Sequence, residues 1–298
     1  MRMMGDIDVE DTYSEAFDGL FSRLCITAID DKRLEKAAVA STSLPCTVFR
    51  ESEGGIERMI SGDETPDNRK GAVIQIWVNY RRDPLERLEY ELGKRIRQGI
   101  LVVPTTSVFN YLDSGDRIDI MKRVGHCGDG YERVEKRYGR DMISIPIMMG
   151  EFIIERYLAY DKGIMGGTLW FFCRDIKSAL EAGDRAVDAI KEMEGVITSF
   201  DICSAGSKVG SRYPHIGPST NHPYCPTLRG EVADSRVPEG VESIPEIVIN
   251  GVNLNVVKKA MKAAMECVAD VKGLVKISAG NYGGKLGKHR IYLRDIAP

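Results

Sequence analysis

A glycine-rich segment near the C-terminus carries the first candidate chemistry in this 298-residue chain. Residues 280–287 read Gly-Asn-Tyr-Gly-Gly-Lys-Leu-Gly. A phosphate-binding Walker loop is excluded, because that motif requires a glycine where Ala279 stands and a Ser or Thr where Leu286 stands. A dinucleotide-binding turn is excluded because residues 289–293 alternate like a strand and open no helix. Two interpretations remain: a tight turn between strands, or a backbone nest that admits a flat or anionic ligand, with Lys285 as counter-charge.

A proline-rich loop and an isolated carboxylate are the next candidates. Residues 219–227 read Ser-Thr-Asn-His-Pro-Tyr-Cys-Pro-Thr, in which prolines stiffen a stretch crowded with hydrogen-bonding side chains. We expect this loop to face a ligand rather than only to connect two elements. Glu246 opens the apolar run 247–249, which has the composition of a central strand, where a carboxylate is unfavourable unless paired or functional. An exposed glutamate at the start of a strand is the alternative.

Metal sites and covalent nucleophiles find little support. The four histidines form neither H-E-x-x-H nor H-x-H, so we expect no metal. There is no G-x-S-x-G elbow, and the seven cysteines contain no C-x-x-C motif. We therefore expect reduced, mostly buried thiols in a cytoplasmic protein.

Four predicted helices and the strands around them must position these segments. Apolar residues recur at helical spacing in 31–40, 83–98, 176–194 and 254–272. The expected N-cap residues are Asp30, Asp83, Asp175 and Asn253. The runs of strand composition are 23–29, 46–49, 72–78, 100–103, 168–173, 196–202, 246–249 and 274–277. The chain therefore reads as strand–helix–strand four times over.

This order indicates an internal duplication. Two strand–helix–strand pairs fall in each half, and Ser-Ala-Gly follows a strand at both 204–206 and 278–280. Two such units in one sheet make the ferredoxin-like, split βαβ arrangement. We predict an α+β fold of two ferredoxin-like lobes, residues 1–146 and residues 147–298, with most motif residues in the second. A three-layer Rossmann sheet is the alternative; the long insertions at 51–71, 111–141 and 206–243 favour the lobes.

Composition excludes several classes of protein. Forty-one Lys and Arg against 44 Asp and Glu give a net charge of −3, without the basic excess of a nucleic-acid binder. No apolar run approaches the length of about 18 residues that a membrane helix needs. The acidic N-terminus lacks a hydrophobic signal core. We expect neither a nucleic-acid nor a membrane partner.

Several of these blocks together resemble the formylmethanofuran:tetrahydromethanopterin formyltransferase family. The densest matches, in the family's order, are 204–211, 218–227, 246–251 and 275–287. Looser matches are 10–17, 64–67, 128–131 and 150–153, so the resemblance spans the chain. It implies transfer of a formyl group from formylmethanofuran to N5 of tetrahydromethanopterin, or of tetrahydrosarcinapterin. It also implies a cytoplasmic homotetramer built as a dimer of dimers, with both coenzymes as substrates, no tightly bound cofactor and no metal.

The resemblance also assigns roles to residues. Such a transfer passes through a tetrahedral carbon bearing an oxyanion, and one carboxyl group can take a proton from the attacking amine and return it to the leaving amine. The family's candidate acid falls on Glu246. Asn221, Asn281 and the backbone amides of 204–208 stay open as oxyanion donors. The tyrosines are expected on the pterin or furan rings and the cations on the anionic coenzyme tails. The predicted coenzyme-binding residues are Ser204, Ser207, Lys208, Arg212, Thr220, Tyr224, Tyr282 and Lys285.

Two other functions stay open. Relatives in bacteria act as one subunit of a larger formyltransferase/hydrolase complex. A pair of ferredoxin-like lobes is also compatible with a non-catalytic small-molecule-binding module.

Overall fold

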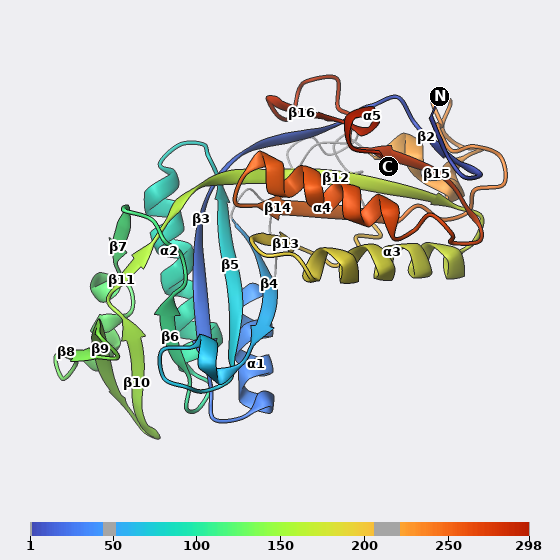
Figure 1. Ribbon diagram of the computed structural model, residues 1–298. Coiled ribbons are helices and arrows are strands. Elements are labelled where there is room, and N and C mark those ends of the chain that lie inside the picture. The colour runs from blue at the N-terminus through green and yellow to red at the C-terminus, as the bar shows by residue number, and fades with distance from the viewer. Residues whose placement is uncertain (1, 44–51, 206–220, 298) are drawn as a thin grey trace. The chain divides into compact units, whose positions relative to one another are not determined.

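The computed structural model of the chain describes residues 2–43, 52–205 and 221–297. The chain divides into two compact units, which we describe separately. The central unit is Gly19–Lys162, and the terminal unit combines Met1–Asp18 with Gly163–Pro298. Both mix helices and strands, so the predicted α+β class is confirmed (Figure 1). The predicted division into 1–146 and 147–298 stays a prediction.

The central unit is built on a β-α-β-β-α-β order. Its elements are β3 (Tyr13–Thr27, in this unit from Gly19), α1 (Asp31–Thr42), β4 (Glu53–Ile60), β5 (Gly71–Asn79), α2 (Pro84–Arg95) and β6 (Ser107–Asn110). These strands pair antiparallel in the spatial order β4-β5-β3-β6. Beyond β6 the sheet continues through β10 (Gly150–Glu155), which is parallel to β6, then β9 (Arg140–Ile147) and β8 (Arg133–Arg137).

Shorter elements complete the central unit. β7 (Arg117–Asp119) and β11 (Tyr157–Ala159) form a separate two-stranded sheet. The 3-10 turns are η1 (Gly62–Glu64), η3 (Ile120–Lys122) and η4 (Gly125–Gly128). The main core lies between the helices and one sheet face, to which Leu24 and Ile26 point, while Cys25 packs with Phe109 on the other face. This alternation is the period-2 pattern of a strand buried on both faces.

The terminal unit repeats the same order of elements. They are β12 (Asp161–Cys173, in this unit from Gly163), α3 (Ile176–Lys191), β13 (Val196–Thr198), β14 (Glu246–Gly251), α4 (Leu254–Glu266) and β15 (Leu274–Ala279). The strands pair antiparallel in the spatial order β13-β14-β12-β15. β15 is extended by the parallel strand β2 (Ile7–Val9), which forms a hairpin with β1 (Arg2–Met4). β16 (His289–Tyr292) pairs with residues 13–16 of β3, and the short helix α5 (Leu293–Ile296) follows.

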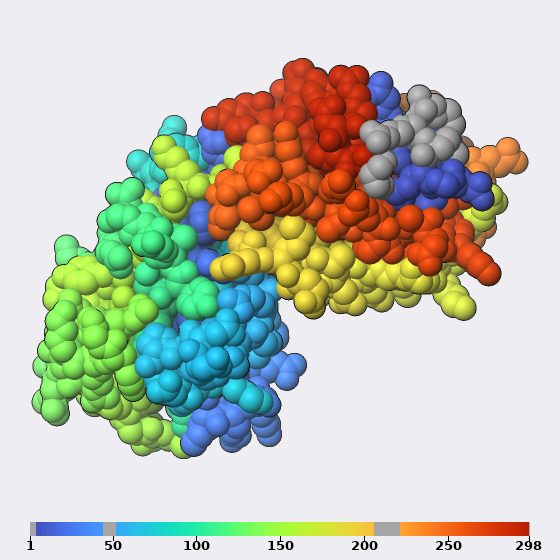
Figure 2. Space-filling model, viewed as in Figure 1, coloured from blue at the N-terminus to red at the C-terminus, as the bar shows by residue number. Residues whose placement is uncertain are grey.

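The two faces of the terminal sheet have different partners. On β12, Leu169 and Phe171 point into the core beneath α3 and α4, which lie side by side along one face of this unit (Figure 2). The alternate residues Trp170 and Phe172 point to the opposite face, where they pack with Val237 and Val241. Because successive side chains of a strand alternate, the six residues 168–173 supply both the core beneath α3 and α4 and the floor of the opposite face.

Helix caps agree with the sequence at three of four predicted positions. The side chains of Asp30, Asp175 and Asn253 each accept a hydrogen bond from the backbone three residues on, at 2.8–2.9 Å. Asp83 was expected to do the same and does not: its φ of 48° places it in the left-handed region, and its side chain makes no capping bond. Proline at the first position of α2 starts that helix instead.

Two predicted strands need comment. Residues 100–103 do not form a strand; Ile96–Leu101 (η2) is a π-helical continuation of α2, and the strand begins at Ser107. One buried helical face continues through Leu88, Leu92, Ile96 and Ile100. The short apolar run 100–103 fits either the end of such a helix or a strand, so the sequence alone does not distinguish them. Gly99 lies inside this helical stretch, where a Cβ would lie 2.7 Å from the backbone of Ser41, so the close approach requires glycine.

The second strand of the central unit lies inside a segment expected to be an insertion. The predicted strand 46–49 lies outside the described residues, whereas β4 occupies Glu53–Ile60. Its two glycines and its Glu57-Arg58 pair conceal it from propensity rules. Gly54 lies close to α1, because a Cβ there would lie 3.1 Å from Thr42 Cα, tighter than an ordinary contact. Within the described residues, no helix combines the length and apolar character needed to cross a bilayer.

Candidate active site

Glu246 and Trp170 face each other across adjacent strands of the terminal unit. β12 and β14 place Trp170 directly opposite Glu246, so both side chains lie on the same face of the sheet, opposite the core beneath α3 and α4. The indole Nε1 of Trp170 donates a hydrogen bond to Glu246 Oε1 at 2.9 Å. The backbone of Glu246 also exchanges hydrogen bonds of 2.8 and 2.9 Å with Cys203. The 9% exposed carboxylate is therefore held by the sheet itself.

Asn221 is the second residue in contact with this carboxylate. Its Nδ2 donates to Glu246 Oε1 at 3.3 Å, and the residue is 8% exposed. The other amide atom, Oδ1, is buried and has no hydrogen-bond partner among the residues that the structure describes. Because an unsatisfied buried acceptor is unfavourable, an N–H group of a bound molecule would be favoured beside the carboxylate.

The hydrogen bonds to Glu246 come from uncharged groups. Within residues 2–43, 52–205 and 221–297, its partners are the indole and the amide on Oε1, and no ion pair reaches its carboxylate. A neutral donor stabilises a carboxylate less firmly than a bidentate guanidinium does. Both of these hydrogen bonds end on the same oxygen, Oε1.

A cavity of about 620 Å³ opens beside Glu246 within the terminal unit. Its lining includes the Trp170 ring, Ser204, Asn221 and Tyr224. The rings of Tyr224 and Trp170 lie 4.5 Å apart at 50°, and Arg236 Nη1 donates to the Tyr224 hydroxyl at 3.3 Å. The cavity thus combines aromatic surfaces, which suit flat rings, with one buried carboxylate.

Two proline-started 3-10 turns shape this wall of the cavity. They are η6 (His222–Tyr224) and η7 (Pro226–Leu228), and each has proline in its first turn. Of the proline-rich loop, Asn221 and residues 224–227 line the cavity, whereas His222 and Pro223 do not. Ser207, Lys208, Arg212 and Thr220 lie outside the described residues.

The glycine-rich turn occupies a different position from the cavity wall. Asn281 Nδ2 donates to Thr12 Oγ1 at 3.0 Å, and Lys285 is exposed. Only Tyr282 reaches toward the site, with its ring edge-on to Trp170 at 6.4 Å between centroids. The backbone amides of the turn do form a nest, but the carboxylate of Glu15 fills it. The Glu15 carboxylate therefore occupies the place in the nest where an anionic ligand was one of the two predicted possibilities.

Two buried thiols are poor nucleophiles. Burial raises the pKa of Cys25 to about 12 and that of Cys173 to about 12, so neither is a thiolate at neutral pH. No disulfide joins the cysteines of the described part of the chain. Among the same residues, no group of three or more His, Cys, Asp or Glu side chains is placed to hold a metal ion.

Two family models together match nearly the whole chain. A family model described as "Formylmethanofuran-tetrahydromethanopterin formyltransferase" matches residues 2–147, and one described as "FTR, proximal lobe" matches residues 150–296. A formylmethanofuran–tetrahydromethanopterin formyltransferase-like protein of Archaeoglobus fulgidus is 57% identical over 99% of this chain and 98% of its own length. The chain belongs to the formylmethanofuran–tetrahydromethanopterin formyltransferase family.

Two solved structures of the family have the same fold. The formylmethanofuran:tetrahydromethanopterin formyltransferase of Methanosarcina barkeri matches with a TM-score of 0.90 at 38% identity, covering 99% of this chain and 100% of that one. A chain from the formyltransferase/hydrolase complex of Methylorubrum extorquens, solved with methylofuran, matches with a TM-score of 0.91 at 34% identity, covering 100% and 99%. The predicted family is therefore confirmed.

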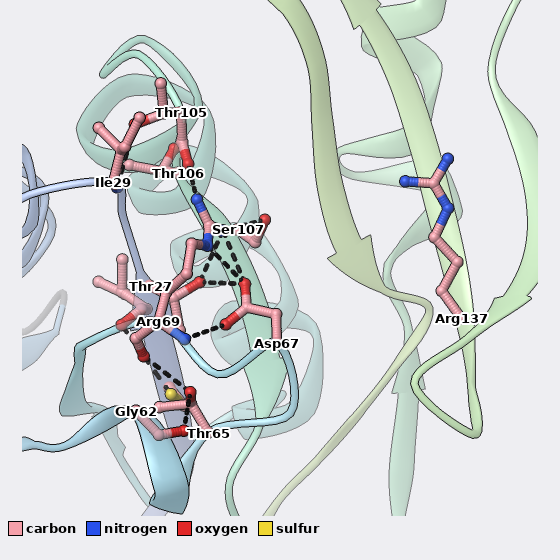
Figure 3. Close-up of polar contacts among 12 residues, drawn as sticks. Thr27, Ile29, Gly62, Thr65, Asp67, Arg69, Thr105, Thr106, Ser107 and Arg137 are labelled. Atoms are coloured by element: carbon pink, nitrogen blue, oxygen red, sulfur yellow. Dashed lines mark hydrogen bonds and ion pairs between the residues drawn. The ribbon is translucent and has the colours of Figure 1, made fainter.

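The formyltransferase-family block at 64–67 belongs to a polar cluster in the central unit (Figure 3). Arg69 donates to Asp67 at 2.8 Å, to the Thr105 carbonyl at 2.6 Å, and to the hydroxyls of Thr27 and Ser107 at 2.8 Å each. Thr105 has φ of 70°, a conformation that a β-branched residue rarely adopts. The cluster ties together the ends of β3 and β6 and the connecting loop. Its contacts are internal, which indicates a structural role.

Trp170 is a residue of the candidate site that the sequence analysis did not identify. The strand 168–173 was predicted, but no role was given to its aromatic side chains. The available signal was the alternation of the strand: residues 170 and 172 share the face opposite 169 and 171. An indole donor opposite Glu246 becomes visible only with the pairing register of β12 and β14.

Proposed function

We propose that this protein transfers a formyl group from formylmethanofuran to N5 of tetrahydromethanopterin or tetrahydrosarcinapterin. The main support is the Glu246 carboxylate, which is buried on a strand, bonded to uncharged donors and open to a cavity of about 620 Å³. The name of the 38% identical Methanosarcina barkeri formyltransferase supplies the reaction and the two coenzymes. Both act as substrates, and no resident cofactor is required.

The reaction proceeds in a ternary complex without a covalent enzyme intermediate. N5 of the pterin attacks the formyl carbon, and a C–N bond forms as the carbonyl π electrons move onto oxygen. Glu246 accepts the proton that N5 loses. The tetrahedral intermediate then collapses: the bond to the methanofuran nitrogen breaks, and Glu246 returns the proton to that nitrogen. Alignment of both coenzymes supplies much of the rate.

Other residues stabilise the charges that appear during this sequence. Asn221, Asn281 or the backbone amides of residues 204–208 donate to the oxyanion; the contact of Asn221 with Glu246 favours Asn221. Tyr224 and Tyr282 pack against pterin or furan rings. Lys208, Arg212 and Lys285 neutralise the anionic coenzyme tails, while Ser204, Ser207 and Thr220 add hydrogen bonds.

The fold that carries this chemistry consists of two ferredoxin-like lobes from an internal duplication. Both units have the β-α-β-β-α-β order, and in both the four strands lie in the spatial order second, third, first, fourth. In both, the fourth strand is extended by one further parallel strand. The two family models meet between residues 147 and 150, which favours a boundary near residue 146 for the repeats.

The protein works in the cytoplasm as a homotetramer, a dimer of dimers. The family resemblance supports this assembly, and the absence of disulfides among the described cysteines is compatible with a reducing compartment. Light scattering after size-exclusion chromatography tests the assembly. The expected mass is four times the 33.1 kDa of one chain.

The deciding experiment mixes purified protein with formylmethanofuran and tetrahydromethanopterin. Product formation is followed by the change in pterin absorbance, and the N5-formyl product is identified by mass. Catalytic turnover with both coenzymes supports the proposal. Binding of either coenzyme without turnover would contradict it and favour the non-catalytic binding module.

A second candidate is a formyltransferase subunit of a larger complex. The match to a chain of the Methylorubrum extorquens complex favours it. Purification of the untagged protein from its source distinguishes the two. Co-purifying subunits in fixed ratio support the complex, whereas an active homo-oligomer supports the autonomous enzyme.

A further inference from the structure

The glycine-rich turn of the terminal unit closes around one buried side chain. Glu15, on β3, is 0% exposed. Its Oε1 accepts hydrogen bonds from the backbone N–H groups of Tyr282 at 2.7 Å and Gly284 at 2.6 Å. Its Oε2 accepts from Leu286 at 2.8 Å and Gly287 at 3.3 Å. One carboxylate therefore satisfies four amides of a six-residue turn.

This contact determines the conformation of the turn. Gly283 and Gly284 have φ of 70° and 78°. Glycine has no side chain whose packing could hold the backbone in this left-handed region. Gly287 lies so close to β3 that a Cβ there would stand 2.1 Å from the Ala16 carbonyl oxygen. The turn is thus wrapped on Glu15. Without the carboxylate, four amide groups would lose their acceptor.

The turn connects Glu15 to the catalytic carboxylate through two aromatic rings. Tyr282, the first residue bonded to Glu15, packs edge-on against Trp170. Trp170 in turn donates its indole N–H to Glu246 at 2.9 Å. Tyr282 packs against the same apolar cluster as Trp170, on the sheet face opposite the core beneath α3 and α4. The orientation of the Trp170 ring therefore depends on a turn that Glu15 anchors.

We propose that Glu15 is a positioning residue of the active site: its carboxylate fixes the 282–287 turn, and the turn sets the Trp170 indole against Glu246. The effect on turnover rests on the proposed formyl transfer. The effect on Trp170 does not.

The test uses the full-length protein in a Trp77→Phe background, where Trp170 is the only tryptophan. Glu15→Gln replaces one acceptor oxygen by an NH₂ group, which faces two backbone N–H groups and cannot accept from them. We expect a shift of the Trp170 emission maximum and about threefold stronger acrylamide quenching. We also expect kcat for formyl transfer to fall about tenfold, with a smaller change in KM.

Glu155→Gln is the matched control. Glu155 is a buried carboxylate of the central unit that likewise accepts from a backbone N–H, that of Asn110 at 2.9 Å. This variant should leave Trp170 emission and kcat near those of the parent. Equal losses in Glu15→Gln and Glu155→Gln would reduce the effect to general destabilisation and overturn the proposal.

A second variant covers the case in which Glu15→Gln fails to fold. Gly284→Ala keeps Glu15 but strains the turn, because alanine disfavours a φ of 78°. It should change Trp170 quenching in the same direction with a smaller amplitude. Unchanged emission and turnover in the folded variants would overturn the proposal. A different outcome separates the two proposals: the parent protein transfers no formyl group, yet Glu15→Gln or Gly284→Ala still alters Trp170 emission. That result would refute the proposed function but support the contact between the turn and Trp170.

Discussion

Glu246 in the terminal unit and Glu57 in the central unit are both buried glutamates on sheet strands, yet their surroundings differ. Glu57 is 1% exposed and receives two hydrogen bonds from Arg23, at 2.6 and 2.8 Å. Gln75 adds a third at 2.7 Å. Glu246 has the indole of Trp170 and the amide of Asn221, both on one oxygen.

The difference separates a structural carboxylate from the one that we propose as catalytic. A bidentate guanidinium compensates the charge of Glu57. Glu57 stands at a β-bulge between Ile56 and Arg58, which turns its side chain toward that partner. Glu246 has uncharged partners on one oxygen only and adjoins a cavity. Burial alone therefore does not distinguish the two glutamates; the charge of their partners does.

The largest expected effect comes from removing the carboxylate that we propose as the general acid and base. Glu246→Gln should lower kcat by about 100-fold or more, because the amide cannot accept and return a proton. Its urea unfolding midpoint should stay close to that of the parent, since an amide oxygen still accepts from Trp170 and Asn221. Steady-state kinetics and urea unfolding measure the two quantities. Near-normal turnover would refute the assignment of Glu246.

Glu57→Gln should produce the reverse result. It leaves the guanidinium of Arg23, with 11% of its side chain exposed, without its counter-charge. We expect a loss of about 3 kcal/mol in the free energy of unfolding of the central unit. Urea unfolding, monitored by the fluorescence of Trp77 in a Trp170→Phe background, measures this loss. Trp77 reports on the site because its indole donates a hydrogen bond to Gln75, which in turn donates to Glu57.

Turnover of Glu57→Gln, measured well below its melting temperature with both tryptophans present, should stay within about twofold of the parent value. A stable Glu57→Gln protein with strongly reduced kcat would break the distinction between the two carboxylates. It would assign a catalytic contribution to the central unit.

Asn221→Ala should have an intermediate effect that refines the comparison. It removes one donor to Glu246 and the unsatisfied Oδ1 acceptor, so we expect kcat to fall about tenfold. The neighbouring His222→Ala is the control, with an expected change below threefold. Equal effects of the two substitutions would show that the loop, and not the Asn221 amide, is responsible.

The smallest effect is a pH dependence of a third buried carboxylate, Glu15. Burial alone would raise its pKa, but the hydrogen bonds from the backbone of Gly284, Leu286, Tyr282 and Gly287 hold the pKa below its usual value. The stability that this anion contributes is complete above the ordinary glutamate pKa, and it is lost as the pH falls through the lowered value.

Fluorescence of Trp170 in the Trp77→Phe background, followed from pH 7 to pH 3, measures this loss. The ionisable groups nearby include Arg290, opposite Glu15 on β16, and Asp18, which pairs with His289 at 2.6 Å and with Lys288. An acid transition of Trp170 should occur in the parent and be absent from Glu15→Gln. The same transition in both proteins would assign it to one of these neighbours.

Much of the fold followed from local sequence. The helices α1, α3 and α4 were predicted because their apolar repeats and their caps at Asp30, Asp175 and Asn253 agree. The π-helical η2 was mistaken for a strand because four consecutive apolar residues fit both. β4 was missed because its polar residues are stabilised by Arg23 and Gln75, which are distant in sequence.

For the candidate site, residue type and spacing were enough to predict which chemical groups are available: an acidic residue at the start of an apolar strand, an amide in a proline-stiffened loop, and a glycine-rich turn able to bind an anion. Those are local properties. The partners of these groups follow from the folded unit. The register of β12 and β14 set Trp170 against Glu246, and the approach of β3 put Glu15, 267 residues from Tyr282 in the chain, into the nest of the turn. Pairing register and long-range contacts depend on the packing of the whole unit, which no short segment encodes.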